Sequence, residues 1–260
     1  MTSGTIPAAD NDVMDLLPPA SLVQYLNTRA GEVTLAALDL RTGRSIMWHS
    51  GEVQATASIV KVNILVKLLA GERPAGSLPS ASVRATAAAM IEESDNTSAT
   101  TLWDMVGGSS ALEAFDRKLG MAQTEPSPCL ECSGFPWPGW GLTKTSAMDQ
   151  VTLLRDLVLA NHWLTNAQRL WALGLMENIV SYERWGLSYG VPNGVTVALK
   201  NGWVPLQNDL WQINSIGWIA GAGRDYVAAV LSEDNPTEQY GIETVDTVGS
   251  DLYYNWAASR

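Results

Sequence analysis

The first residues whose types and spacing could do chemistry are the serine and lysine of Ser58-Ile59-Val60-Lys61. On a helix this spacing puts the amine about one turn from the hydroxyl on the same face, where it can accept the serine proton and create a nucleophile. A capping serine followed by a lysine with a solvated head group would give the same letters, and such a match is expected roughly once by chance in a chain of this size. The chemical interpretation is favoured because Lys61 lies in an otherwise apolar helical stretch, where an unpaired charge is costly.

Two further short strings follow along the chain, Ser94-Asp95-Asn96 and Lys200-Asn201-Gly202. Taken singly, the first suits a helix N-cap and the second a turn at the end of a strand. In this order after Ser-x-x-Lys, they resemble the signatures Ser-x-x-Lys, Ser-Asp-Asn and Lys-Thr-Gly of serine β-lactamases and penicillin-binding proteins, closest to class A β-lactamases. The string Met90-Ile91-Glu92-Glu93-Ser94-Asp95-Asn96-Thr97 is also similar to the family's second element, and the resemblance covers about residues 33–256.

The resemblance implies an acyl-transfer mechanism. Ser58 would attack a carbonyl group to form an acyl-enzyme, with Lys61 as proton acceptor or relay. Ser94 would pass the proton to the leaving nitrogen. Asn96 would hydrogen-bond the substrate's side-chain amide and Lys61, and Lys200 would supply positive charge for a substrate carboxylate.

The third motif also contributes backbone and side-chain contacts by this resemblance. The amides of Ser58 and of Trp203, which follows Gly202, would form the oxyanion hole. The motif departs from the family at Asn201, which stands where the family has a hydroxyl that touches the substrate carboxylate. An arginine near this motif often binds that carboxylate in the family, and Arg184 is the best-placed candidate, although a surface arginine packed on a neighbouring tryptophan fits equally well.

The residue that would activate the deacylating water is a second departure. Class A β-lactamases carry a glutamate in a loop roughly 35 residues after the second motif. Glu131 is favoured by spacing and Glu125 is the other choice, but Glu131-Cys132-Ser133-Gly134-Phe135 does not match the family's Glu-x-x-Leu-Asn. An exposed loop acid is the alternative role for Glu131.

Composition restricts the partners. The formal charge is -11, from 27 acidic and 16 basic side chains, and no basic cluster is present to neutralise a phosphate backbone. We therefore expect a small-molecule acyl substrate (a β-lactam, peptide or ester), no nucleic acid and no membrane span. The first residues lack a secretory pattern, so we expect a soluble protein, cytoplasmic as written or exported if a leader has been removed.

No cofactor and no metal are expected, because the two cysteines and two histidines are too few and too scattered for a complete zinc site. The pair Cys129 and Cys132 lies in a proline-, glycine- and tryptophan-rich loop over residues 121–142, where structural thiols or a loop-closing disulfide are both consistent with the sequence. Some of the eleven tryptophans gather near the expected site loops and either wall an apolar pocket or pack in the core: Trp137, Trp140, Trp185 and Trp203.

Periodicity predicts the fold. A helix near residues 22–29 and strands over 33–40 and 45–49 precede an apolar helix from Ser58. Three helices follow over residues 81–120, separated by Ser94-Asp95-Asn96 and Gly107-Gly108-Ser109-Ser110, whose serines suit helix caps. Two more helices, three strands and a C-terminal helix complete an α/β fold like that of β-lactamases and DD-peptidases, with an antiparallel sheet flanked by helices from both termini and an all-helical lobe. We expect one unit over residues 1–260, with the α/β lobe at about 15–57 and 193–260 and the helical lobe at about 58–192.

These observations predict an active-site serine hydrolase that works through an acyl-enzyme on an amide or ester. The alternatives are a penicillin-binding or sensor-type protein that acylates but turns over slowly, and a DD-peptidase or esterase with little β-lactamase activity. The missing Glu-x-x-Leu-Asn context favours these alternatives, because a carboxylate without its supporting partners is seldom held in a productive position.

Overall fold

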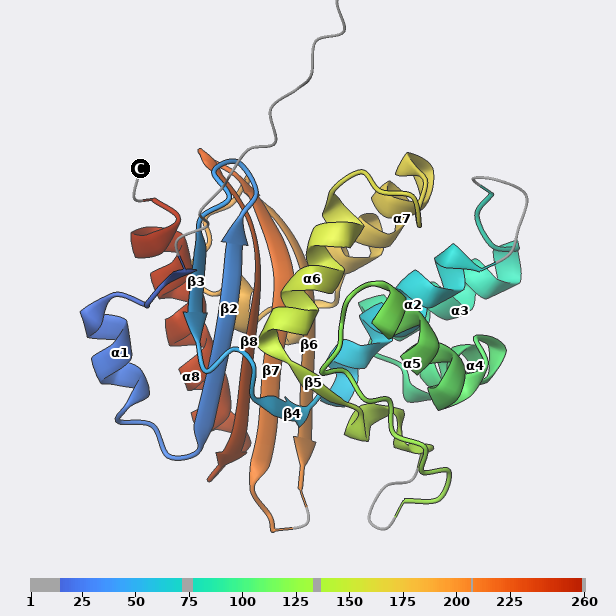
Figure 1. Cartoon of the computed structure of the whole chain (residues 1–260), viewed down its shortest axis with the longest axis horizontal. Coiled ribbons are helices and arrows are strands. Elements are labelled where there is room, and N and C mark those ends of the chain that lie inside the picture. The colour runs from blue at the N-terminus through green and yellow to red at the C-terminus, as the bar shows by residue number, and fades with distance from the viewer. Residues whose placement is uncertain (1–14, 72–76, 133–136, 207, 259–260) are drawn as a thin grey trace, which may run out of the picture.

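A twisted sheet forms one side of the molecule and a group of helices the other (Figure 1). The computed structural model describes residues 15–71, 77–132, 137–206 and 208–258. The strand order is β1-β3-β2-β8-β7-β6, and every neighbouring pair is antiparallel except β1 with β3. The strands are β1 Asp15–Leu16, β2 Glu32–Asp39, β3 Ser45–Trp48, β6 Thr196–Pro205, β7 Trp211–Gly221 and β8 Arg224–Asn235.

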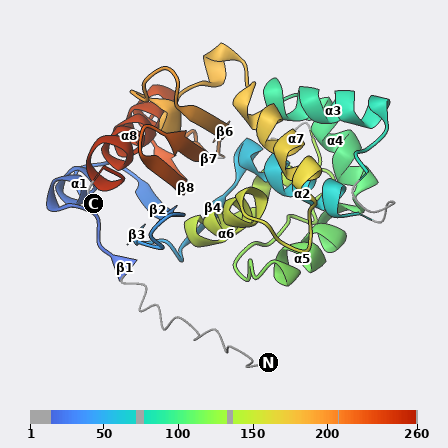
Figure 2. The ribbon, with the colours of Figure 1, turned by 90° about the horizontal axis from the view of Figure 1, so that it is seen from above.

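Alternation along the strands divides the core between the two faces of the sheet. Ala228 and Val230 of β8 pack with α1 (Ala20–Leu26) and α8 (Glu238–Asp251), whereas Ala229 and Leu231 pack in the cluster formed with the other helices. Successive side chains of a strand point to opposite faces, so one strand supplies both clusters. Figure 2 shows α1 and α8 on one side of the sheet and α6 (Ala147–Val158) with the remaining helices on the other.

The helix α2 (Val60–Ala70) is the centre of the helical group. Nine of its side chains are buried, which explains why the sequence is apolar almost all round this helix. Around it lie α3 (Ala81–Glu92), α4 (Asn96–Met105), α5 (Gly108–Lys118) and α7 (Asn166–Glu177). A short pair of strands, β4 (Val53–Ala55) and β5 (Lys144–Ser146), ties the segment before α2 to the segment before α6.

The predicted α/β architecture is confirmed, with two differences near the motifs. Asp95 and not Ser94 caps α4, because its side chain accepts the amide of Ser98, and Gly107 stands at the N-cap of α5. The strand predicted to end in a turn at Lys200-Asn201-Gly202 instead continues as β6 to Pro205, which an edge strand tolerates. The division into lobes at residues 58 and 193 stays a prediction. In the described part of the chain, no helix has the length and apolar character needed to span a bilayer.

Candidate active site

Ser58 lies at the entrance to the buried helix, in the 3-10 helix η1 (Ala57–Ile59). Its side chain is half-buried, and its hydroxyl makes no hydrogen bond with the described residues. The residue before it, Ala57, has a φ of +46°, a left-handed conformation that alanine rarely adopts and that is often found beside functional residues. The local backbone therefore presents an accessible hydroxyl from a constrained turn.

Gly202 allows the edge strand β6 to approach this turn. A Cβ at Gly202 would lie 2.7 Å from the amide nitrogen of Ser58 and 2.9 Å from the carbonyl oxygen of Thr56. Both contacts are with backbone, which cannot move away as a flexible side chain can. The absence of a side chain at Gly202 thus brings the third motif and the serine amide together.

Lys61, one turn after Ser58, is fully buried and meets the second motif. Its ammonium nitrogen lies 2.6 Å from the carbonyl oxygen of Ser94, 3.1 Å from the Ser94 hydroxyl and 2.7 Å from Asn96 Oδ1. The indole ring of Trp140 lies beside it, with its centroid 5.0 Å from Lys61 Nζ. The structure therefore brings together Lys61, Ser94 and Asn96, and the sequence places Ser58 one turn before this lysine.

Burial lowers the pKa of Lys61 to about 6, because the desolvated interior disfavours the charged form and the nearby Lys200 repels it. The carboxylates of Glu183 and Asp95 oppose this shift. At neutral pH most Lys61 side chains are thus uncharged, with a lone pair able to accept a proton. Lysine is a general base only under such conditions.

Ser94 is held by its backbone as well as by Lys61. It has a φ of +54°, and the next residue, Asp95, caps α4 through the amide of Ser98 at 2.6 Å. Because Asp95 caps the helix, the Ser94 hydroxyl is left to contact Lys61. The turn between α3 and α4 thus directs Ser94 and Asn96 toward the same amine.

Lys200 forms a buried ion pair that the sequence did not predict. Its ammonium nitrogen lies 2.8 Å from Glu183 Oε2, and the two side chains are 0% and 1% exposed. Its other acceptor among the described residues is the carbonyl oxygen of Asn201, at 3.0 Å. Burial lowers the pKa of Lys200, and the Glu183 carboxylate opposes that shift.

Two other residues expected to touch a substrate carboxylate point elsewhere. The amide nitrogen of Asn201 donates to the carbonyl oxygens of Glu183 and Trp185, at 2.7 and 3.1 Å. Arg184 is exposed and donates to the carbonyl oxygen of Glu177 at 2.9 Å. Trp203 is half-buried, and its ring packs edge-on against Trp185 with centroids 6.0 Å apart.

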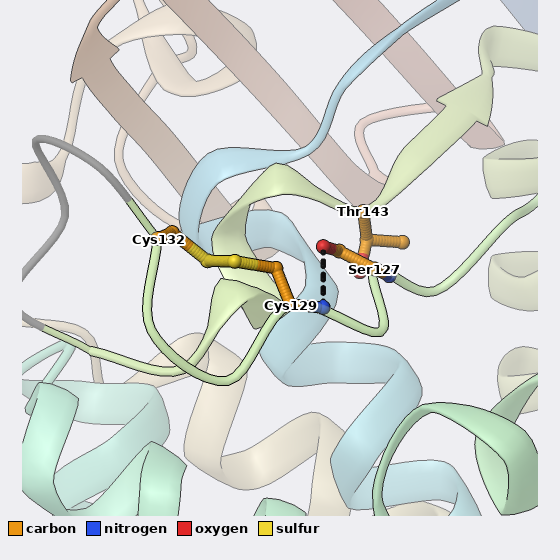
Figure 3. Close-up of a disulfide and its surroundings, with 4 residues drawn as sticks. All are labelled: Ser127, Cys129, Cys132 and Thr143. Atoms are coloured by element: carbon orange, nitrogen blue, oxygen red, sulfur yellow. Dashed lines mark hydrogen bonds between the residues drawn. A yellow bond between two sulfur atoms is a disulfide. The ribbon is translucent and has the colours of Figure 1, made fainter.

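Within the loop over residues 121–142, a disulfide joins Cys129 and Cys132 (Figure 3). Of the two possibilities that the sequence left open for these cysteines, the disulfide is present. The backbone amide of Cys129 is 3.4 Å from the Ser127 hydroxyl, and Gly139 packs beneath the disulfide, where a Cβ would lie 2.9 Å from Cys132 Sγ. The 3-10 helix η2 (Gly139–Leu142) carries Trp140.

This loop presents Trp140 to Lys61 and leaves Glu131 outside. Trp140 is buried and its indole nitrogen donates to the Thr100 hydroxyl at 3.2 Å. Glu131 is exposed and has no hydrogen bond or ion pair with the described residues. The charged groups that act on Lys61 are Lys200, Glu183 and Asp95 and do not include it. A role for Glu131 in deacylation stays a prediction.

Among the described residues, one group of side chains whose ligand atoms lie close enough to hold a cation is found on the surface. Potential ligand atoms of Glu32, His49 and Glu52 lie within 4.8 Å of one another, and all three residues are exposed. Exposed acidic groups often gather without an ion, and none of the three belongs to the three motifs. We assign no metal function to them.

Glu183 and Trp140 are the site residues that sequence reasoning missed. Glu183 directly precedes the arginine chosen as the carboxylate ligand, and only its placement in the 3-10 helix η3 (Ser181–Glu183) turns it inward. The sequence predicts for Trp140 either a pocket wall or core packing, and nothing in it connects this residue with Lys61. The only available signal for Glu183 was its position close before a strand that carries a lysine.

Comparison with known proteins links this geometry to one family. The profile of the family described as the beta-lactamase enzyme family matches residues 72–256, which include the second and third motifs and begin after Lys61. The chain is 26% identical over 207 residues to LppW, a candidate lipoprotein of Mycobacterium tuberculosis and M. bovis. The match covers 77% of this chain and 62% of LppW, so the chain spans less than two thirds of these relatives.

Solved structures share the fold at low sequence identity. The TLA-1 extended-spectrum β-lactamase is 18% identical with a TM-score of 0.78, covering 90% of this chain and 96% of that one. A class A β-lactamase from Mycobacterium abscessus is 24% identical with a TM-score of 0.76, over 92% and 99% of the two chains. PBP-A is 23% identical with a TM-score of 0.75, over 91% and 94%.

Proposed function

We propose that this chain, which belongs to the beta-lactamase enzyme family, is an active-site serine hydrolase that acts on an amide or ester through an acyl-enzyme on Ser58. The observation that carries the proposal is the environment of Lys61. It is fully buried, its pKa is lowered to about 6, and it contacts Ser94 and Asn96 one turn from an accessible serine. A buried lysine in a neutral state supplies the base that a serine nucleophile needs.

The proposed reaction begins when Ser58 Oγ attacks the carbonyl carbon of the substrate. A bond forms between Oγ and this carbon while the hydroxyl proton moves to the neutral amine of Lys61. The bond to the leaving nitrogen or oxygen then breaks, and the leaving group takes a proton from the Ser94 hydroxyl, which Lys61 replenishes through their 3.1 Å contact. Backbone amides of Ser58 and Trp203 stabilise the oxyanion, as the family resemblance implies.

Slow hydrolysis of the acyl-enzyme is the second candidate function, that of a penicillin-binding or sensor-type protein or a peptidase. It is favoured by the loop over residues 121–142, which places the indole of Trp140 beside Lys61 and leaves Glu131 exposed. An exposed Glu131 does not supply a base to the water that would release the acyl group.

Intact mass spectrometry over time tests both functions. Incubation with benzylpenicillin, or with an activated ester, should add one acyl mass to the protein and none to Ser58→Ala. A labelled Ser58→Ala variant would refute the nucleophile. An adduct that persists for hours supports slow turnover, whereas a transient adduct with released product supports a rapid hydrolase.

Glu131→Gln separates the two outcomes further, with Glu125→Gln as the matched loop control. If Glu131 activates the deacylating water, its variant traps the adduct while the control turns over like the parent. We expect both variants to behave like the parent, because Glu131 is exposed and makes no hydrogen bond or ion pair with the described residues. Selective trapping by Glu131→Gln would overturn that expectation.

Export to an oxidising compartment accompanies this proposal. Disulfides such as that between Cys129 and Cys132 persist mainly outside the reducing cytosol, and the relative LppW is named as a candidate lipoprotein. Alkylation of the unreduced, denatured protein taken from its own cells should find no free thiol. Two free thiols would contradict export.

A further inference from the structure

The positive charge of the third motif is already neutralised inside the protein. The ammonium of Lys200 lies 2.8 Å from the Glu183 carboxylate, and both side chains are shielded from water. Opposite charges at this distance cancel much of each other's field at longer range, and burial removes the solvent that would otherwise screen the pair. A substrate group near Lys200 therefore meets a neutral ion pair and not a free cation.

The neighbouring groups do not replace that charge. Both Asn201 amide hydrogens are directed to carbonyl acceptors, those of Glu183 and Trp185, and these two bonds fix the orientation of the amide. The Asn201 atom without a partner among the described residues is Oδ1, an acceptor that repels a carboxylate oxygen. Arg184 donates to the backbone of Glu177 on the surface. The Asn201 amide hydrogens are thus engaged with backbone carbonyl groups, and a guanidinium nitrogen of Arg184 is held by Glu177.

We propose that Glu183 sets the substrate preference of this site, and that the acyl donor carries a neutral polar group, such as an ester, amide or hydroxyl, where a carboxylate would otherwise meet Lys200. This inference rests on the proposed function. Glu183 acts through Lys200 as a positioning residue and does not take part in bond making. A substrate carboxylate would have to compete with a buried carboxylate that already holds Lys200, and the repulsion between the two disfavours it.

A matched pair of acyl donors tests the proposal. The second-order rate of Ser58 acylation is measured by intact mass for benzylpenicillin and for its methyl ester, each divided by its rate of hydrolysis by hydroxide. The wild-type protein should acylate with the ester at least as fast as with the acid. In Glu183→Gln the ratio of acid to ester should rise on the order of 10- to 100-fold, as expected for removing one buried charge a few ångströms from the substrate. Glu177→Gln, an exposed glutamate a few residues earlier, should leave the ratio unchanged.

The possible outcomes distinguish the proposed substrate preference from the proposed serine hydrolase function. Failure of both donors to label Ser58 would overturn the proposed function, and the substrate preference with it. Labelling in which the wild-type protein prefers the acid by tenfold or more, or in which Glu183→Gln leaves the ratio unchanged, would overturn the preference alone. Should Glu183→Gln fail to fold, the wild-type ratio decides, because it needs no variant. A loss of stability alone would slow both donors equally and would not change the ratio.

Discussion

The pH dependence of acylation follows from the environment of Lys61. Burial and the charge of Lys200 lower its pKa from 10.5 to about 6. At pH 7 about nine-tenths of the side chains are then neutral, against roughly one in three thousand for a lysine with an unshifted pKa. The shift corresponds to about 6 kcal/mol of differential stabilisation of the neutral amine. The available base is thus greater by about three orders of magnitude at neutral pH.

The assay is the second-order rate of Ser58 acylation by an uncharged activated ester, measured between about pH 4.5 and pH 9. The rate should rise about tenfold per pH unit below pH 6 and become level above it, because only the neutral amine accepts the proton. Lys61→Ala should lower the level rate by about 10²-fold or more. Lys67→Ala is the control on the same helix, since Lys67 is half-buried and its ammonium lies over Phe115, 5.3 Å from the ring centroid.

Two results would refute this reasoning. A rate that keeps climbing to pH 9 would mean that Lys61 is charged at neutral pH and acts only after losing its proton there. A Lys61→Ala variant that keeps the same acid limb would assign the limb to another group. Circular dichroism at each pH keeps these results separate from unfolding.

Two further predictions concern packing and stability. Gly202→Ala should lower the rate of Ser58 acylation about 10²-fold or more, because the added Cβ pushes β6 away from the Ser58 amide. Gly174→Ala is the control, since a Cβ there meets nothing within 4 Å. Equal acylation rates in the two variants, by the same assay, would refute the role of the close approach between Gly202 and the Ser58 amide. Asp116 is fully buried and lies 3.3 Å from Asn63 Nδ2, and burial raises its pKa to about 7. Between about pH 4 and pH 7 the unfolded chain therefore loses the Asp116 proton while the folded protein keeps it. The free energy of unfolding falls as the pH rises across this range. The free energy of unfolding of Asp116→Asn, measured by urea titration, should therefore increase relative to that of the wild-type protein by about 1 kcal/mol per pH unit across this range. If the free energies of unfolding of the two proteins changed with pH in parallel, the raised pKa of Asp116 would be contradicted.

The parts of the fold and site that sequence reasoning predicted depend on local patterns. The apolar surround of α2, the nearly continuous apolar runs of β2 and β8 and the order of helices and strands can each be read from consecutive residues. The pairing of Lys61 with the second motif could be expected once the three motifs had been placed in one family. Whether a residue lies on the buried face of a helix or strand depends on residues close to it in sequence, so these predictions needed no information on tertiary contacts.

The features that the sequence did not predict are set by contacts between distant segments. Glu183 and Lys200 are 17 residues apart, and a 3-10 turn, which has no sequence periodicity, directs the glutamate inward while Arg184 faces solvent. Trp140 reaches Lys61 from the 3-10 helix η2, far along the chain from this lysine, next to Gly139, which packs against the disulfide. The length of β6 depends on pairing with β7, which outweighs the turn preference of an Asn-Gly step.

The protonation of the two buried lysines, Lys61 and Lys200, is coupled through their charges. Two ammonium groups in one dry site would repel, and the repulsion from Lys200 is one cause of the low pKa of Lys61. Burial also lowers the pKa of Lys200, and its ion pair with Glu183 opposes that shift by favouring the charged form. Neighbouring groups whose environments separate their pKa values can take different roles at one pH. Under the proposed function Lys61 is the uncharged base, and under the proposed substrate preference the Glu183 carboxylate that pairs with Lys200 keeps this lysine from a substrate carboxylate.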